Sequence, residues 1–241
     1  MRRVLILPAV VGLLSLYCWS QAAPATPAAP AKKPAAAKPA TAVVAAKPTA
    51  IINTTAGKLT CTLFPEKAPI GVANFVGLSK GTKDWVSPVD GQKKHNVPLY
   101  DGTIFHRVIP DFMIQGGDAK GDGTGDPGYK FKNETSPDLA FDRPGRLAYA
   151  NAGPDTNGSQ FFITEVPYPS LNGGYTLFGQ CDDASVELVK KIARMPRDSN
   201  DLPYVPVKIT HITITGMGVH HAAGAAPKKP AAAASKATTP K

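Results

Sequence analysis

The 241-residue sequence lacks several motifs that mark common hydrolases and nucleotide-binding proteins. It has no H-E-x-x-H segment, no recognisable Ser/His/Asp set and no Gly-Lys-Ser/Thr after its glycine-rich stretch, Asp118–Tyr129. That stretch has Tyr129 at its twelfth position, where a calcium-binding EF-hand loop needs a bidentate Glu. We therefore expect no metal site there, and we expect its glycines to permit sharp backbone turns.

Cysteine is also scarce. Cys18 lies in the N-terminal apolar run, which leaves Cys61 and Cys181, and their spacing matches no metal-binding motif. The pair forms either one disulfide, as in an oxidising compartment, or two buried thiols. Both residues lie in apolar, strand-like runs where cysteine acts as a small hydrophobic residue, and this context favours the thiols.

Branched and aromatic residues are nearly absent from residues 24–50 and 217–241, which are rich in Ala, Pro and Lys. Such segments bury too little apolar surface to offset the entropy of ordering, so we expect a disordered spacer and a disordered tail. Residues 1–23 combine a basic start, an apolar run and small residues at the end, the pattern of a secretory signal peptide. We therefore expect an exported protein, periplasmic or extracellular, with a retained membrane anchor as the alternative.

A net charge of +9 would suggest an anionic partner if it were spread over the whole chain. Ten basic residues and no acidic ones lie in the signal-like start, the spacer and the tail, which leaves 17 basic and 18 acidic residues between Ile51 and His221. The folded part is close to neutral, which argues against nucleic-acid binding. The basic arms remain available to contact an envelope polymer or a membrane surface.

The part between the arms, residues 51–216, reads as one domain with many short strands and two helices. Two short runs around Ala56-Gly57 predict a hairpin, and Thr82–Leu99 is expected to be an exposed loop. This pattern predicts a mainly β fold, a closed antiparallel barrel capped by two helices. The expected helices cover Ile70–Lys80 and Ala184–Met195, and the other expected strands lie within Tyr100–Gly117, Gly145–Ala150, Asn151–Thr164, Tyr175–Cys181 and Pro206–Thr215.

Two glycine-bounded blocks carry unusual residue combinations. In Tyr100–Gly117, strict alternation places Phe105, Arg107 and Ile109 on one strand face, with His106 opposite as a structural histidine. After a Pro-Asp bend, Met113 and Gln115 share a face. Taken alone, this block also fits an arginine at a strand edge whose head group reaches water.

The second block, Asn151–Thr164, ends in a strand that presents Gln160 and Phe162 together. Apolar, amide and guanidinium groups suit a reaction that needs no nucleophile, acid or metal. Rotation about an X-Pro peptide bond is such a reaction, because its barrier comes from partial double-bond character. A fixed donor to the prolyl nitrogen would reduce that conjugation, and an apolar cup would hold the ring.

Both blocks resemble the signature segments of the cyclophilin-type peptidyl-prolyl isomerases. These segments are FHRVIPDFMIQGG at Phe105–Gly117 and ANAGPDTNGSQFFIT at Ala150–Thr164, with Leu63–Gly81 and Tyr175–Gln180 similar to flanking elements in the same order. The likeness spans about Ile51–Thr215, and bacterial members often carry a loop at the place of Thr82–Leu99. It implies an eight-stranded barrel, no cofactor and proline-containing polypeptides as partners, and we expect a monomer.

The resemblance also implies roles for individual residues. Arg107 would donate to the prolyl nitrogen, and Gln115, Gln160 and the backbone at Ala150 and Asn151 would hold the substrate chain. Residues expected to form the proline cup are Phe112, Met113, Phe162 and Leu171, with Tyr175 beside them.

Two positions depart from the pattern of cyclophilin A-like members. Ser170 replaces a tryptophan that contributes to cyclosporin binding, which predicts weak inhibition, and Tyr175 replaces a histidine. Two further interpretations stay open. One is a binding module that grips proline peptides with little catalysis, and the other gives the basic arms a tethering role.

Overall fold

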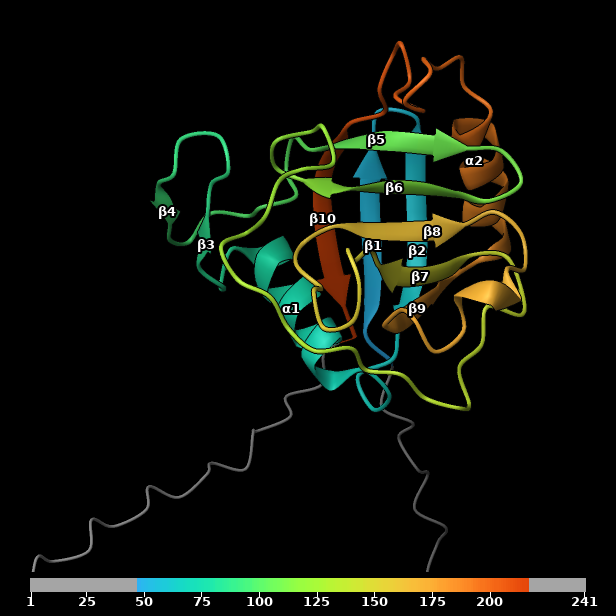
Figure 1. The fold of residues 1–241 in the computed structure, drawn as a ribbon, viewed down its shortest axis with the longest axis horizontal. Helices are drawn as coiled ribbons and strands as arrows, with labels where there is room; N and C mark the ends of the chain where they lie inside the picture. The colour runs from blue at the N-terminus through green and yellow to red at the C-terminus, as the bar shows by residue number, and fades with distance from the viewer. Residues whose placement is uncertain (1–46, 217–241) are drawn as a thin grey trace, which may run out of the picture. The chain divides into compact units, whose positions relative to one another are not determined.

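The computed structural model describes residues 47–216, and eight strands of this part form one antiparallel sheet curved into a barrel (Figure 1). Its order is β10-β1-β2-β9-β7-β8-β6-β5, so the sequence-distant β1 and β10 are neighbours. The mainly β fold with two helices is as expected. The strands are β1 (Thr49–Thr54), β2 (Gly57–Leu63), β5 (Ile104–Ile109), β6 (Met113–Asp118), β7 (Arg146–Tyr149), β8 (Phe161–Thr164), β9 (Leu177–Cys181) and β10 (Ile209–Thr215).

The expectation of a closed barrel was too strong. The ladder runs from β10 to β5 without joining its two ends, and only one isolated bridge, between Ile104 and Lys208, spans the gap. Backbone hydrogen bonds beside it, from Ile209 N–H to Thr103 O (2.7 Å) and from Phe105 N–H to Val207 O (3.0 Å), hold the seam together. The segment before β10 therefore completes the barrel without forming a regular strand pair.

The predicted β1–β2 hairpin is present, with Thr54 paired to Gly57 across the turn. The Thr54 hydroxyl accepts from Ala56 N–H and donates to Gly57 O, which fixes this turn locally. Strand β1 begins at Thr49, so its first two residues lie in the segment expected to be a disordered spacer. Residues 1–46 and 217–241, with the predicted signal, most of the spacer and the tail, lie outside the described part.

Helix α1 (Pro69–Lys80) packs against β10 and buries Val72, Phe75 and Leu78 in the interior core, and helix α2 (Asp183–Ala193) packs beside β2, β5 and β6. Proline starts α1, and Gly81 ends it with φ of +72°, as expected for a left-handed C-terminal cap. Asp182 caps α2 by accepting from Ser185 N–H at 2.8 Å, a role that the sequence did not suggest. Neither helix of the described residues is long and apolar enough to cross a membrane.

The sheet has apolar clusters on both faces, and strand alternation separates them. In β6, Ile114 packs in the interior core while Met113 packs in an outer cluster. In β8, Phe161 faces the interior and Phe162 the outer cluster. The outer cluster (Met113, Phe141, Ala148, Phe162, Leu171 and Leu177) becomes the floor of the site described below.

The two cysteines are joined, contrary to the favoured interpretation of buried thiols. Cys61 on β2 and Cys181 on β9 are direct partners in the antiparallel ladder and form a disulfide. Both are buried. Apolar context alone could not distinguish the two outcomes, because a buried disulfide and a buried thiol suit the same environment, and strand pairing decides between them.

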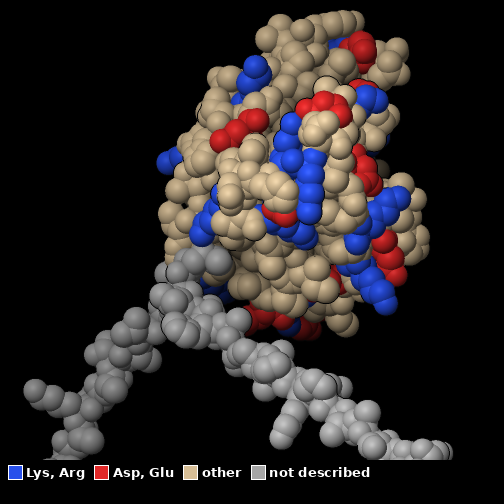
Figure 2. All heavy atoms as spheres, turned by 90° about the vertical axis from the view of Figure 1, so that its left-hand side faces the viewer, with Lys and Arg blue, Asp and Glu red and all other residues tan. Residues whose placement is uncertain are grey.

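Residues 82–99, expected to form an exposed loop, contain a small hairpin of β3 (Trp85–Val86) and β4 (Lys93–Lys94). Trp85 packs in the interior core, which fastens the hairpin to the domain, and its indole donates to Val97 O at 2.9 Å within the same segment. Figure 2 views the molecule from the side of this hairpin and shows basic and acidic side chains interspersed. This face offers no broad surface of one charge sign.

Candidate active site

A bulge in β5 decides which way Arg107 points. Phe105 pairs with Gly116, and Arg107 pairs with the adjacent Gln115. His106 is therefore an extra residue on β5 that has no partner on β6. Phe105 consequently packs in the interior core, while Arg107 and Ile109 lie on the outer face. The prediction that Phe105 and Arg107 share a face was wrong, because strict alternation does not hold across a bulge.

The outer face carries a cavity of about 350 Å³. Of the ten residues proposed from the sequence, all but Gln160 line it, and they converge from four separate chain segments. These lining residues are Arg107, Phe112, Met113, Gln115, Ala150, Asn151, Phe162, Leu171 and Tyr175, joined by others including His106, Gly123 and Asn200.

Aromatic and aliphatic side chains form an apolar cup in this cavity. Met113, Phe162 and Leu171 are nearly inaccessible to solvent. The Tyr175 ring meets the Phe162 ring edge-on at 5.5 Å between centroids, and the Phe141 ring stacks on Phe162 at 5.9 Å. The cup therefore has a packed second layer beneath it, as expected of a preformed ligand site.

Gln160 lies in a neighbouring hollow of about 360 Å³ that also includes Gln115, Ala150 and Asn151. Its Nε2 donates to Gly123 O and Gly125 O, both at 3.0 Å, and its Oε1 accepts from Gln115 Nε2 at 2.9 Å. The Gln160 amide thus ties the glycine-rich stretch to the strand that carries Gln115. Asn151 is held at the rim by a bond from its Nδ2 to Gly174 O.

Among the described residues that line this cavity, Arg107 alone has a cationic side chain. Its side chain is 44% exposed, and its nearest acidic partner is Asp201, 3.7 Å from Nε. Asp201 also accepts from Arg197 Nε at 3.1 Å, and its backbone carbonyl accepts from Val108 N–H. The loop after α2 is thereby fixed beside Arg107, while no hydrogen bond joins the Arg107 guanidinium to another residue within 47–216.

His106 is buried at the cavity wall, against Gly123. Neither ring nitrogen has a hydrogen-bond partner within the described residues. Burial lowers the pKa of His106, and the nearby carboxylates of Asp118 and Asp122 offset this in part. The ring is therefore neutral near pH 7 and contributes shape to the cavity wall.

The glycine-rich stretch is organised by one buried carboxylate. Asp118 accepts backbone N–H groups from Lys120 (2.8 Å), Gly123 (2.7 Å) and Gly125 (3.1 Å). No group of three or more potential metal-ligating side chains occurs between residues 47 and 216. Asp118 instead shapes the loop that carries Gly123 to the cavity, a role that the sequence alone did not indicate.

Comparison with known proteins settles the family. The model for "Cyclophilin type peptidyl-prolyl cis-trans isomerase/CLD" matches residues 49–214. The chain belongs to the cyclophilins. It is a peptidyl-prolyl cis-trans isomerase, as are the curated relatives that it resembles.

Peptidyl-prolyl cis-trans isomerase A of Mycobacterium tuberculosis is 52% identical over 168 residues, which are 69% of this chain and 92% of the relative. Peptidyl-prolyl cis-trans isomerase B of Streptomyces anulatus is 47% identical over 167 residues, which are 68% and 95%. A crystal structure of a Cryptosporidium parvum cyclophilin, solved in the presence of the dipeptide Ala-Pro, is 37% identical with a TM-score of 0.59. That match covers 69% of this chain and 98% of the other.

Two supports of this cyclophilin site escaped the sequence reasoning. Glu165, buried at the end of β8, accepts from Asp111 N–H at 2.8 Å and from Arg194 at the end of α2. Arg194 also pairs with the Asp111 carboxylate at 2.9 Å. These contacts fix the turn that delivers Phe112 to the cup. Nothing in the local sequence pairs Glu165 with Arg194, because the contact depends on how α2 packs.

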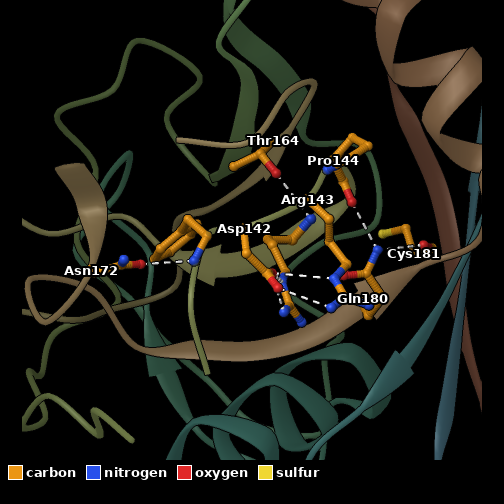
Figure 3. A network of polar contacts seen from close by, with 9 residues as sticks. Asp142, Arg143, Pro144, Thr164, Asn172, Gln180 and Cys181 are labelled. Carbon is orange, nitrogen blue, oxygen red and sulfur yellow. Dashed lines mark hydrogen bonds and ion pairs between the residues drawn. The ribbon is translucent and has the colours of Figure 1, made fainter. Parts of the chain in front are cut away.

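The second support lies under the cup, in the segment from Phe141 to Arg146 (Figure 3). Arg146 donates to Asp142 through Nε and Nη2, at 3.2 and 2.6 Å, and its N–H donates to the Thr164 hydroxyl. Phe141 N–H donates to Asn172 Oδ1 at 2.8 Å. This network holds the Phe141 ring against Phe162.

The sequence carries a G-x-S-x-G string at Gly77–Gly81, but this string is not a nucleophile elbow. Ser79 is buried in α1 and its hydroxyl donates to Phe75 O at 2.7 Å. A serine nucleophile must be exposed on a strand-to-helix turn, so Ser79 has a structural role.

Proposed function

We propose that this cyclophilin accelerates X-Pro rotation in exported polypeptides, with Arg107 as the donor to the prolyl nitrogen. The observation that carries the proposal is the cavity itself. It is lined by the guanidinium of Arg107, by the apolar cup and by the side-chain amides of Gln115 and Asn151. Each of these groups meets one need of peptide-bond rotation, and none of them requires a cofactor.

The chemistry follows from the origin of the barrier. Rotation about the peptide bond costs about 18–20 kcal/mol because the nitrogen lone pair is delocalised into the carbonyl. A donor directed at the nitrogen favours the twisted state, in which the lone pair is localised, over both planar states. The guanidinium of Arg107 makes no hydrogen bond to another described residue, and its ion pair with Asp201 is long, at 3.7 Å, so its N–H groups can turn to a substrate.

The remaining lining residues suit binding of the substrate. Phe112, Met113, Phe162 and Leu171 form an apolar surface of the kind that accepts a proline ring. Gln115, Ala150 and Asn151 border both hollows, which makes them candidates to hold the extended chain on either side of the proline. The Ala-Pro dipeptide named with the C. parvum structure supports a proline-containing ligand.

Two observations support export. The first 23 residues have the composition of a secretory signal, and Cys61 and Cys181 form a disulfide, which persists mainly in oxidising compartments. The basic arms would then lie where they meet envelope polymers or a membrane surface.

The catalytic proposal is tested by the cis-to-trans rate of an X-Pro peptide with wild-type protein, Arg107→Ala and Arg107→Lys. We expect Arg107→Ala to lower kcat/KM by about 100-fold, the usual loss for a donor to a developing charge, and Arg107→Lys to lose less. Asp201→Asn serves as the control, because it removes the neighbouring charge but leaves the guanidinium. An unchanged rate in Arg107→Ala would refute the role of this residue, and wild-type protein that binds but does not accelerate would favour a binding module.

Export is tested by fractionating cells that express the full chain or a variant without residues 2–23. We expect the full chain outside the cytoplasm with its N-terminus cleaved near residue 24. Equal cytoplasmic retention of both forms would refute export, and an uncleaved N-terminus in the membrane fraction would indicate an anchor. Removal of residues 217–241 tests the tethering role, which equal envelope retention would exclude.

A further inference from the structure

The exposed turn beside the cup carries Ser170, and the same turn supplies an aromatic side chain from another residue. Tyr168 precedes the short 3-10 helix Pro169–Leu171. Its ring lies 4.4 Å from the ring of Phe112, centroid to centroid, with 42° between the planes. Phe112 lines the cavity, so the aromatic surface of the cup continues outward onto Tyr168.

The Tyr168 side chain is accessible, and its backbone is fixed in place. The residue is 37% exposed and is one of few large apolar side chains exposed to this degree within residues 47–216. Its N–H donates to Phe141 O at 2.8 Å, and its carbonyl accepts from Leu171 N–H at 3.1 Å. Phe141 N–H in turn donates to Asn172 Oδ1 (Figure 3). The Phe141 backbone therefore holds both ends of the turn.

The turn and the cup therefore share one support. Phe141 is buried and stacks on Phe162 with 14° between the ring planes. Phe112 is held separately by the Glu165 and Arg194 contacts to its own turn. The backbone of each of these two aromatic residues is held by a different network, and their rings contact each other, which offers a preorganised surface that binds a ligand at a lower entropic cost than a mobile loop would.

The chemistry of this surface selects its ligand. No charged residue occurs from Val166 to Leu171, and the turn contains two prolines. Paired aromatic rings attract a third aromatic ring through stacked or edge-to-face contact, in addition to the area that is buried. A small side chain such as alanine would gain little from it.

We propose that Phe112 and Tyr168 form an aromatic shelf that binds an aromatic side chain adjacent to the substrate proline, and that Tyr168 gives the enzyme a preference for such substrates. The proposal rests on the proposed binding of the proline in the cup. Because the shelf adjoins the cup through Phe112, a residue next to the bound proline is close enough to reach it.

The test compares kcat/KM for isomerisation of peptides that differ only beside the proline. One series carries Phe or Ala after the proline, and a second carries Phe or Ala before it. Full-length wild-type protein is compared with Tyr168→Ser, with Tyr168→Phe as the ring-retaining variant, and with Ser170→Ala as a control on the same exposed turn.

In one of the two series, we expect the kcat/KM of wild-type protein to be about two- to tenfold higher for the Phe peptide than for the Ala peptide, which is the range of a single aromatic contact. Tyr168→Ser should lose that preference through a higher KM, while its rate on Ala peptides stays within about twofold. Tyr168→Phe and Ser170→Ala should keep the preference.

Equal preference in wild-type protein and Tyr168→Ser, or an equal loss on Phe and Ala peptides, would overturn the proposal. The second result would mean that Tyr168 only supports the fold. Failure of the proposed function has a different signature, since wild-type protein would then accelerate no peptide in either series.

Discussion

The disulfide between Cys61 and Cys181 should make a large contribution to stability, and its removal gives the sharpest test of the fold. The two cysteines are 120 residues apart in the sequence, so the bond closes a long loop in the unfolded chain. In the simple closure model, closing a loop of this length lowers the entropy of the unfolded chain, which stabilises the folded protein by about 5 kcal/mol. Native disulfides typically contribute less, about 2–4 kcal/mol, and we expect a value in this range.

The perturbation is reduction of the wild-type protein or the double substitution Cys61→Ala/Cys181→Ala. For a domain of 150–250 residues, each kcal/mol shifts Tm by roughly 2–4 °C. A loss of about 2–4 kcal/mol should therefore lower Tm by about 4–16 °C. The double variant also leaves space in a buried region, so its Tm should lie at or below that of the reduced wild-type protein.

Differential scanning calorimetry with and without a phosphine reductant measures the shift. The double variant is the control, because its Tm should not respond to reductant. Titration of thiols in the denatured, unreduced protein without its signal gives an independent reading. Two reactive thiols in that titration, or a wild-type Tm unchanged by the reductant, would refute the reasoning and restore the interpretation of buried thiols.

Three further predictions concern single side chains. Burial lowers the pKa of His106, so the unfolded chain binds a proton more readily than the folded protein does, and the free energy of unfolding should fall as the pH drops below about 6.5. Urea titrations between pH 7.5 and 5 should show a smaller decrease for His106→Gln, and parallel curves would contradict this. Tyr149→Phe should lower the free energy of unfolding by about 1–3 kcal/mol, because the buried hydroxyl donates to Gly71 O at 2.9 Å and accepts from Asn74 Nδ2 at 3.0 Å; an unchanged urea midpoint would show that these bonds add nothing. Cyclosporin should inhibit the isomerase weakly. The variant Ser170→Trp should lower the inhibitory concentration of cyclosporin by about tenfold or more, because it adds an aromatic anchor. Equal inhibition of both proteins would show that Ser170 is not the cause of the weak inhibition.

The local pattern of apolar residues predicted most of the helices and strands, because this pattern reflects which face of each element is buried. Met113 and Gln115 alternate with Ile114 as expected, since β6 is regular where they lie. In α2, Val186, Val189, Ile192 and Ala193 recur at the spacing of one helix face, and all four are buried.

The errors arose where the outcome depends on how one element pairs or packs with another. The bulge at His106 follows from the pairing of β5 with β6, and the disulfide follows from the pairing of β2 with β9. The contacts that fix Phe112 and Tyr168 come from α2 and from the segment before β7, far along the chain. The sequence could therefore name the residues that line the cup but not those that hold them there.

The two ends of the domain meet at a single point. Thr49 and Thr215, the first residue of β1 and the last of β10, are direct partners in the ladder. A short linker could join them, and new termini could be opened at Gly91, an exposed glycine on the β3–β4 hairpin with φ of +68° and no side chain packed against it. Such a circular permutant would keep every strand pair of the barrel. The same proximity would let the whole domain be inserted into a loop of another protein without separating the ends of that loop.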